Sequence, residues 1–200
     1  MPANEGDVVR MELLPLEERV LTVPDGCQDH WYAHAANWVR DREVLDIGAG
    51  MGPGLPHLNR GGPSRLVGMD PLPGGVLVVK GVIEDVPDKS FDVVVACDVI
   101  EHVEDDVAFL GHMLRVARER VFFSTPNWNR SRCQNPHHFR EYTPEELARL
   151  VEWHRYESWV SDDDGIVTGA LLSEVEDEPN FGILIESDRL HRLSSWSHGA

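Results

Sequence analysis

A glycine-rich segment near residue 50 has residue types that can bind a small-molecule cofactor. The strand-like run 44–47 (VLDI) leads directly into the segment 48–54 (GAGMGPG). Glycines let the backbone turn sharply and approach a ligand closely, because they carry no Cβ atom. The dinucleotide-binding fingerprint GxGxxG finds Pro53 where its third glycine belongs. The spacing GxGxG, preceded by Asp46, therefore favours a different ligand.

Carboxylates stand at the ends of two successive strand-like runs. Asp46 comes at the end of the first run, where it can accept a hydrogen bond from an ammonium group or organise the glycine-rich turn. Asp70 closes the second run, residues 67–70 (VGMD), where a carboxylate is placed to bind both hydroxyls of a ribose. Asp70 therefore indicates a ligand that contains a ribose.

Strands and helices alternate along most of the chain, and this alternation predicts a mostly parallel sheet that positions these groups. A later helix is expected to begin at Thr143 and Pro144, which suit an N-cap and the first helical position, and to run to about residue 153. An acid-rich stretch between the last two strands is interpreted as a solvated hairpin connection. The strand-like runs are 43–47, 65–70, 76–79, 91–96, 121–124, 156–160 and 183–185, and the other helical patterns cover 27–41, 55–60 and 104–119.

Composition and charge narrow the class of protein. The chain has 200 residues, with 18 basic and 35 acidic side chains and a formal net charge of −17. This size fits one domain, and the charge disfavours an indiscriminate nucleic-acid or membrane-surface binder. The longest apolar run, 93–97, is far shorter than the roughly 20 residues of a membrane helix. The N-terminus lacks the pattern of a secretory signal, so a cytoplasmic protein is expected, and three widely spaced cysteines indicate neither a disulfide framework nor a zinc knuckle.

Four ordered motifs together resemble the class I S-adenosylmethionine-dependent methyltransferases, specifically the type 11 and type 23 groups. The motifs are VLDIGAGMGPG (44–54), VGMD (67–70), FDVVVACDVIEHV (91–103) and VFFSTPN (121–127). The resemblance covers about residues 40–187, after an N-terminal helical segment 1–40. It implies S-adenosylmethionine as cofactor and a Rossmann-like, doubly wound α/β fold, with a mostly parallel seven-stranded sheet that ends in an antiparallel pair.

The same resemblance implies which residues contact the cofactor. The glycine-rich loop holds its methionine part, the acid after the second strand binds its ribose, and residues after the third and fourth strands flank the adenine and the sulfonium. Carried over by motif, these residues are Asp46, Gly48, Gly50, Gly52, Asp70, Val82, Ile83, Cys97 and Asp98.

Two departures from the family pattern change local expectations. Only residues 71–75 separate Asp70 from the next strand-like run, whereas a parallel crossover takes about 10–12 residues or more. The helix after the second strand is therefore expected to be reduced. The family often has an aspartate where Val82 stands, so adenine is expected to be held by backbone groups and apolar packing, or by Glu84 or Asp85.

Candidates for the catalytic residues follow the fourth and fifth strands. Glu101, His102 and His137 are expected to face the methyl acceptor, because imidazole can accept a proton near neutral pH. The alternative for Glu101 and His102 is packing at the start of the next helix. The segment 115–140 holds six arginines and one acid, which indicates either an anionic acceptor or a surface stretch that offsets acidic neighbours.

We therefore expect methyl transfer, mainly to oxygen, on a small-molecule or glycan-type acceptor, with no membrane partner and no assigned metal. One alternative is an RNA 3′-end 2′-O-methyltransferase, in which Asp98, Glu101 and His102, with His137 or His138, hold a divalent ion. Another is a non-catalytic protein that retains the fold, either as an S-adenosylmethionine-binding protein or as a scaffold with a degenerate site. The intact Asp46 and Asp70 argue against a scaffold.

Overall fold

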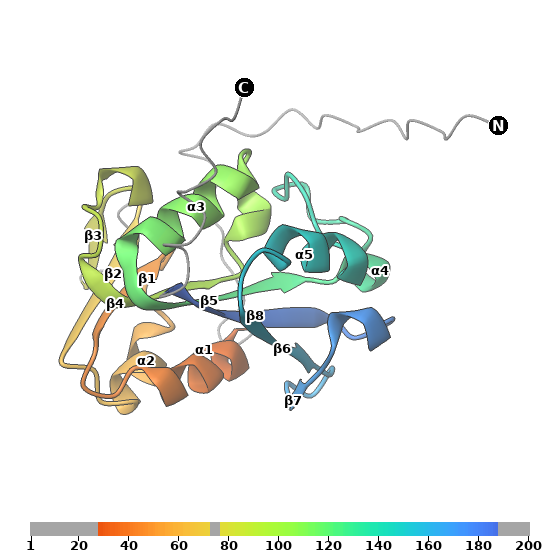
Figure 1. The fold of residues 1–200 in the computed structure, drawn as a ribbon, viewed down its shortest axis with the longest axis horizontal. Helices are drawn as coiled ribbons and strands as arrows, with labels where there is room; N and C mark the ends of the chain where they lie inside the picture. Colours follow the sequence, from red (N-terminus) through yellow and green to blue (C-terminus); the bar gives the residue numbers. More distant parts are fainter. Residues whose placement is uncertain (1–27, 73–76, 188–200) are drawn as a thin grey trace, which may run out of the picture.

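A computed structural model describes residues 28–72 and 77–187 and shows one eight-stranded sheet with helices on both faces (Figure 1). The strand order is β3-β2-β1-β4-β5-β8-β6-β7. Strands β3 to β5 in this order are parallel, and β8, β6 and β7 continue the sheet antiparallel. The strands are β1 Glu43–Ile47, β2 Arg65–Asp70, β3 Val78–Lys80, β4 Phe91–Cys97, β5 Ala117–Pro126, β6 Tyr156–Ser161, β7 Val167–Gly169 and β8 Asn180–Glu186.

Two layers of helices cover the sheet. In Figure 1, α3 and α5 lie on one side of it and α1 and α2 on the other. Short 3₁₀ turns at Ala36–Trp38, Ile83–Asp85, Ile100–His102 and Leu172–Glu174 join the longer elements. The helices are α1 Asp29–Ala35, α2 Leu55–Arg60, α3 Asp106–Val116, α4 Trp128–Ser131 and α5 Pro144–Val151.

The central strand β4 shows why its sequence is continuously apolar. Val93 and Val95 lie in the cluster under α1, while Val94 and Ala96 lie in the cluster under α3 and α5. Successive side chains of a strand point to opposite faces, so a strand covered on both faces needs apolar residues at every position. The run of valines therefore fits a strand in the middle of the sheet, between β1 and β5, that is covered by apolar side chains on both faces.

The predicted fold is confirmed, with one additional strand. The sheet has eight strands where seven were expected, because β7 forms within the acid-rich stretch and pairs with β6 through Ser161 and Val167. Its three residues, Val-Thr-Gly, are too few to show an alternating pattern. The predicted helix over 104–119 ends at Val116, since Ala117 to Arg120 already belong to β5.

The connection after β2 and the N-terminal helix also agree with the sequence. None of the described residues between β2 and β3 is helical, and residues 73–76 lie outside the described residues. Trp31 is fully buried, and its ring centroid lies 6.2 Å from that of Phe122. This tryptophan therefore packs in the core. Residues 1–27 of the predicted N-terminal segment lie outside the described part of the chain.

Thr143 caps α5 as its sequence predicts. Its side chain accepts a hydrogen bond from the Glu146 backbone N–H, and the Glu146 side chain accepts one from the Thr143 backbone. Among the described residues, no helix is both long enough and apolar enough to cross a membrane.

Candidate functional site

The glycine-rich loop lies between β1 and α2, at the carboxyl ends of the parallel strands. Gly48, Gly50 and Gly52 have positive φ angles of 73°, 55° and 85°, a backbone conformation that residues with a Cβ atom rarely adopt. A Cβ atom at Gly48 would lie 2.5 Å from the Cγ2 atom of Val99. The loop can therefore pass close to the segment after β4 only because glycine stands at position 48.

Asp46 lies beneath this loop and is fully buried. The Tyr32 hydroxyl lies 3.4 Å from its Oδ1 atom, while its Oδ2 atom has no hydrogen-bond partner within the described residues. Burial raises the pKa of Asp46 to about 8, although the Tyr32 hydrogen bond opposes this rise. A buried carboxylate oxygen without a partner fits a ligand group that donates hydrogen bonds, such as an ammonium.

Asp70 connects the end of β2 to the glycine-rich loop. Its Oδ2 atom accepts a hydrogen bond of 2.9 Å from the Gly50 backbone N–H, and its Oδ1 atom accepts one of 2.8 Å from Leu72. Each carboxylate oxygen can accept a second hydrogen bond. Asp70 can therefore hold the loop and still accept hydrogen bonds from ribose hydroxyls.

The two residues predicted to contact adenine, Val82 and Ile83, differ in the solvent exposure of their side chains. The side chain of Val82 is exposed and offers apolar surface, whereas that of Ile83 is buried in the core under α3. The backbone carbonyls of Ile83 and Glu84 accept hydrogen bonds from Arg115. Of the two predicted residues, Val82 is thus the one whose side chain can face a ligand.

The carboxyl end of β4 places Cys97 and Asp98 at the centre of the site. Cys97 is buried, and Asp98 has a positive φ of 52°. The Ser124 hydroxyl, on the neighbouring strand β5, donates a hydrogen bond of 2.5 Å to the Asp98 Oδ1 atom. The pKa of Asp98 is raised because the carboxyl group is buried, and the hydrogen bond from Ser124 opposes only part of this rise.

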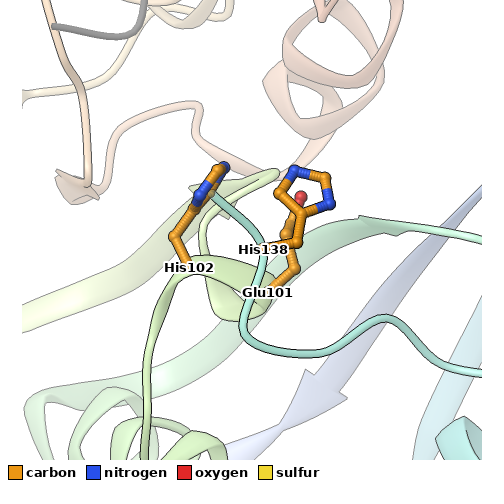
Figure 2. Close-up of side chains that lie close together, drawn as sticks. All are labelled: Glu101, His102 and His138. Atoms are coloured by element: carbon orange, nitrogen blue, oxygen red, sulfur yellow. The ribbon is translucent and has the colours of Figure 1, made fainter. Parts of the chain in front are cut away.

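Glu101, His102 and His138 form a compact cluster next to this position (Figure 2). One carboxylate oxygen and one ring nitrogen from each histidine all lie within 4.8 Å of one another. Glu101 and His102 belong to the 3₁₀ turn after β4, and His138 belongs to the loop before α5. Glu101 is fully buried, and within the described chain neither of its carboxylate oxygens has a hydrogen-bond partner.

The structure brings His138, and not His137, into the cluster. The His137 carbonyl oxygen lies 3.0 Å from the His102 Nδ1 atom, so His137 contributes its backbone there. The Nδ1 atom of His137 itself is buried without a partner among the described residues. The main sequence prediction named His137 as a catalytic candidate, and only the metal-binding alternative also named His138. The signals for His138 in the sequence are the adjacent pair of histidines and Glu141 three residues further on.

Most arginines of the predicted basic segment have acidic partners within the fold. Arg115 binds Asp88, Arg118 binds Asp92 and Glu43, Arg130 binds Asp163, and Arg140 binds Asp106. For these four arginines, the structure favours the second interpretation, in which they neutralise the charge of neighbouring acids. An anionic acceptor is therefore not needed to explain the local charge.

The sheet order, the glycine-rich loop and the two acids Asp46 and Asp70 define a Rossmann-like protein that binds a nucleoside-containing cofactor. A family model described as a methyltransferase domain matches residues 29–159, so the chain belongs to this family of S-adenosylmethionine-dependent methyltransferases. This match confirms the predicted family and, with it, S-adenosylmethionine as the cofactor. The buried, unpartnered Asp46 oxygen fits this cofactor, which carries an ammonium group.

Similar proteins support the same assignment. The chain is 34% identical over 175 residues to a probable S-adenosylmethionine-dependent methyltransferase of Mycolicibacterium smegmatis, covering 78% of this chain and 66% of that protein. It is 30% identical over 143 residues to a ubiquinone biosynthesis O-methyltransferase of a Methylobacterium species, covering 54% of this chain and 57% of that one. The matched region thus spans about two thirds or less of the length of these curated relatives.

A solved structure of an S-adenosylmethionine-dependent methyltransferase from Aquifex aeolicus has the same fold. Its TM-score is 0.60 at 16% identity, and the match covers 84% of this chain and 97% of that one. At this identity the likeness supports the fold only.

Proposed function

We propose that this protein transfers the methyl group of S-adenosylmethionine to an oxygen atom of a small-molecule acceptor. The observation that carries the proposal is the buried Asp46 oxygen without a partner, next to a loop of three glycines with positive φ. A relative named as a ubiquinone biosynthesis O-methyltransferase supports oxygen as the atom that is methylated.

In this proposal, Asp46 accepts a hydrogen bond from the ammonium group and Asp70 accepts hydrogen bonds from the ribose. The glycine-rich loop lets the backbone lie against the methionine part, because no Cβ atom intervenes. Val82 offers an apolar surface to the adenine, next to the backbone of Ile83, while Cys97 and Asp98 line the centre of the site.

The acceptor side of the site consists of Glu101, His102 and His138. The bound cofactor would supply a methyl group on a positively charged sulfur. An acceptor hydroxyl oxygen forms the new bond to this carbon by in-line displacement as the carbon–sulfur bond breaks, its electron pair stays on sulfur, and the hydroxyl proton passes to an imidazole of the cluster or to solvent. The chain contributes mainly by holding both reactants in line. The entropy of bringing them together is then lost on binding and no longer adds to the barrier of the reaction. Among the predicted catalytic residues, Glu101 and His102 keep their place in this proposal, and His138 takes the place given to His137.

Calorimetry with S-adenosylmethionine and S-adenosylhomocysteine tests the cofactor half. We expect both to bind, and we expect Asp70→Ala to raise the dissociation constant at least ~10-fold, equal to about 1.4 kcal/mol. Glu157→Gln is the matched control, because this exposed acid lies on β6, away from β1 and β2. Far-UV circular dichroism checks that each variant folds. Absence of binding to the folded wild-type chain would reject the enzyme and favour a scaffold, while unchanged affinity in Asp70→Ala would show that the ribose lies elsewhere.

An RNA acceptor is a second candidate, because the clustered Glu101, His102 and His138 are among the residues that this alternative requires. The net charge of −17 opposes it, since the protein repels a polyanion at long range. Activity assays that use a short single-stranded RNA in one arm and a mixture of catechols and vicinal diols in the other distinguish the two acceptors. Methylation of RNA alone would overturn the small-molecule proposal.

A further inference from the structure

The acceptor side of the site encloses oxygen atoms that lack hydrogen-bond donors. Glu101 is fully buried, and neither of its carboxylate oxygens accepts a hydrogen bond from a described residue. Thr125 lies near the end of the strand β5, which pairs with β4, and it is also fully buried. Its hydroxyl oxygen has no partner in the described part of the chain either. Buried polar groups are normally hydrogen-bonded, so these three oxygens point to donors from a ligand.

The electrostatic environment of these oxygens is acidic. Burial raises the pKa of Glu101 well above its ordinary value, and Asp98 and Glu141 raise it further, whereas the Thr125 hydroxyl lies close enough to lower it. A buried carboxyl group keeps its proton or takes a cationic partner, because an unpaired buried charge is costly. The two acids near Glu101 repel an anion and attract a cation. A ligand group at this place is therefore expected to be positively charged.

The ring of His138 lies beside Glu101 but does not supply this positive charge (Figure 2). Its Nδ1 atom lies 2.5 Å from the Glu141 carboxylate, which can only accept a hydrogen bond, so this nitrogen carries a proton. Its Nε2 atom lies 2.9 Å from the Asn135 Nδ2 atom, which donates. The amide has this orientation because its oxygen accepts a hydrogen bond of 3.0 Å from the His137 backbone N–H. The ring therefore carries one proton and no charge.

Lysines and arginines do not supply the charge either. Within the described ranges, none of them forms an ion pair with Glu101 or Asp98, and the arginines of the segment 115–140 that form ion pairs bind other acids. His30, in α1, is close enough to Asp98 for each to affect the pKa of the other. Burial lowers the pKa of His30, although Asp98 raises it, so this ring is mostly uncharged near neutral pH. A cationic ligand group would thus meet acids and uncharged rings here.

We propose that the methyl acceptor carries a primary ammonium group, which Glu101 and Thr125 bind, in addition to the hydroxyl that is methylated. This inference rests on the proposed function, because it specifies the acceptor of the same site. A primary ammonium has three N–H donors, which match the three enclosed oxygens without partners. Its charge pairs with the Glu101 carboxylate in surroundings from which water is excluded, where the attraction is stronger than at the surface.

The enclosure of these oxygens also limits the shape of the acceptor. An ammonium group that reaches Glu101 must pass the His138 ring, so it has to stand at the end of a slender chain. A quaternary ammonium is bulkier and has no N–H donor, so it fits less well. The net charge of −17 attracts small cations to the protein and repels anions. Amino alcohols and hydroxylated aromatic amines are therefore the expected acceptors.

Calorimetric binding of acceptors to the full chain with S-adenosylhomocysteine tests this class without any methyl transfer. Three probes share a catechol ring and a two-carbon side chain that ends in a primary amine, a hydroxyl or a carboxylate, and a second series uses a three-carbon vicinal diol. We expect the amine to bind at least ~10-fold more tightly than the carboxylate, with the alcohol between them. The trimethylammonium analogue of the catechol amine should bind more weakly than the primary amine. Chelator in every solution excludes bridging by a metal ion.

Variants of the two binding residues test which groups cause the preference. Glu101→Gln keeps the shape of the side chain and should abolish most of the preference for the amine over the carboxylate. Glu157→Gln is the matched control, because it makes the same change of net charge at an exposed position on β6 and should retain the preference. Thr125→Val removes one acceptor and is expected to weaken amine binding by roughly 5-fold, which keeps the site testable if Glu101→Gln fails to fold.

Three results would overturn this acceptor class. The first is equal binding of amine and carboxylate in both series, or no binding of either amine at millimolar concentration. The second is a folded Glu101→Gln variant that keeps the preference, because the buried charge would then have another partner. The third is a Glu101→Gln variant that binds S-adenosylmethionine more weakly but S-adenosylhomocysteine as before, which would assign the carboxylate to the sulfonium of the cofactor. Absence of methyl transfer with a retained amine preference would instead reject only the proposed function.

Discussion

At the scale of single residues, burial of Asp46 lowers the stability of the folded chain, while the same carboxyl group is available to bind a ligand. Its carboxylate is buried with one oxygen unpartnered, and burial raises its pKa to about 8. A buried carboxyl with a raised pKa keeps its proton in the folded chain, where the unfolded chain has already lost it. Folding stability is therefore lost as the pH rises from about 4 to about 8, and the loss is complete above the folded-state pKa. The same group is available to a ligand ammonium.

Asp46→Asn is expected to stabilise the protein without cofactor while weakening cofactor binding. Removal of the buried ionisable group relieves about 2 kcal/mol near pH 8, which corresponds to roughly 6 °C in Tm for a chain of this size. The gain should shrink toward zero as the pH falls below about 4, where the wild-type carboxyl becomes protonated in both states. Thermal unfolding with and without S-adenosylmethionine measures both effects. An equal Tm difference at all pH values would show that Asp46 does not titrate in this range.

At the scale of elements, sequence patterns predicted the strands better than the loops between them. The valine run of β4 predicted a buried central strand, because each residue contacts one of two apolar layers. The cap of α5 at Thr143 was also predictable, since capping depends on residues close together in the chain. The presence of His138, and not His137, in the cluster with Glu101 and His102 could not be predicted. Adjacent residues in an irregular loop have no periodicity that fixes the directions of their side chains. The candidate cofactor residues were predicted from local motifs, whereas the cluster of Glu101, His102 and His138 depends on contacts between segments far apart in the chain.

The glycine-rich loop provides a prediction at this scale, with a control inside the same loop. A Cβ atom at Gly48 would lie 2.5 Å from Val99, whereas one at Gly50 would meet no atom within 4 Å. Both glycines have positive φ, so both alanine variants carry backbone strain of about 1 kcal/mol. Gly48→Ala should cost at least ~2 kcal/mol in total, because Val99 or the loop must also move. Urea denaturation measures the difference, and equal losses in the two variants would contradict the close approach of the loop to Val99.

At the scale of the whole molecule, the charge of −17 acts on stability more than on the site. Several arginines pair with acids, among them Arg42 with Glu119 at 2.7 Å and Arg118 with Asp92 at 2.6 Å. Exposed pairs of this kind contribute little to the free energy of unfolding and are weakened by salt. The excess of acids leaves a net repulsion that favours expansion of the chain. Salt therefore weakens both the stabilising ion pairs and the destabilising net repulsion. The larger of these two effects decides whether added salt raises or lowers the stability.

We expect the Tm near pH 8 to rise as sodium chloride increases from about 0.02 M to about 0.5 M, because the Debye length falls from roughly 20 Å to roughly 4 Å and screens this repulsion. Near the isoelectric point of about 4.8 the excess charge is small, so added salt should leave the Tm unchanged or lower it through the weakened ion pairs. Thermal unfolding at both pH values, with sucrose as an uncharged control, measures the effect. A Tm that falls with salt near pH 8 would mean that the ion pairs of Arg42, Arg118 and their neighbours stabilise this protein more than its net charge destabilises it.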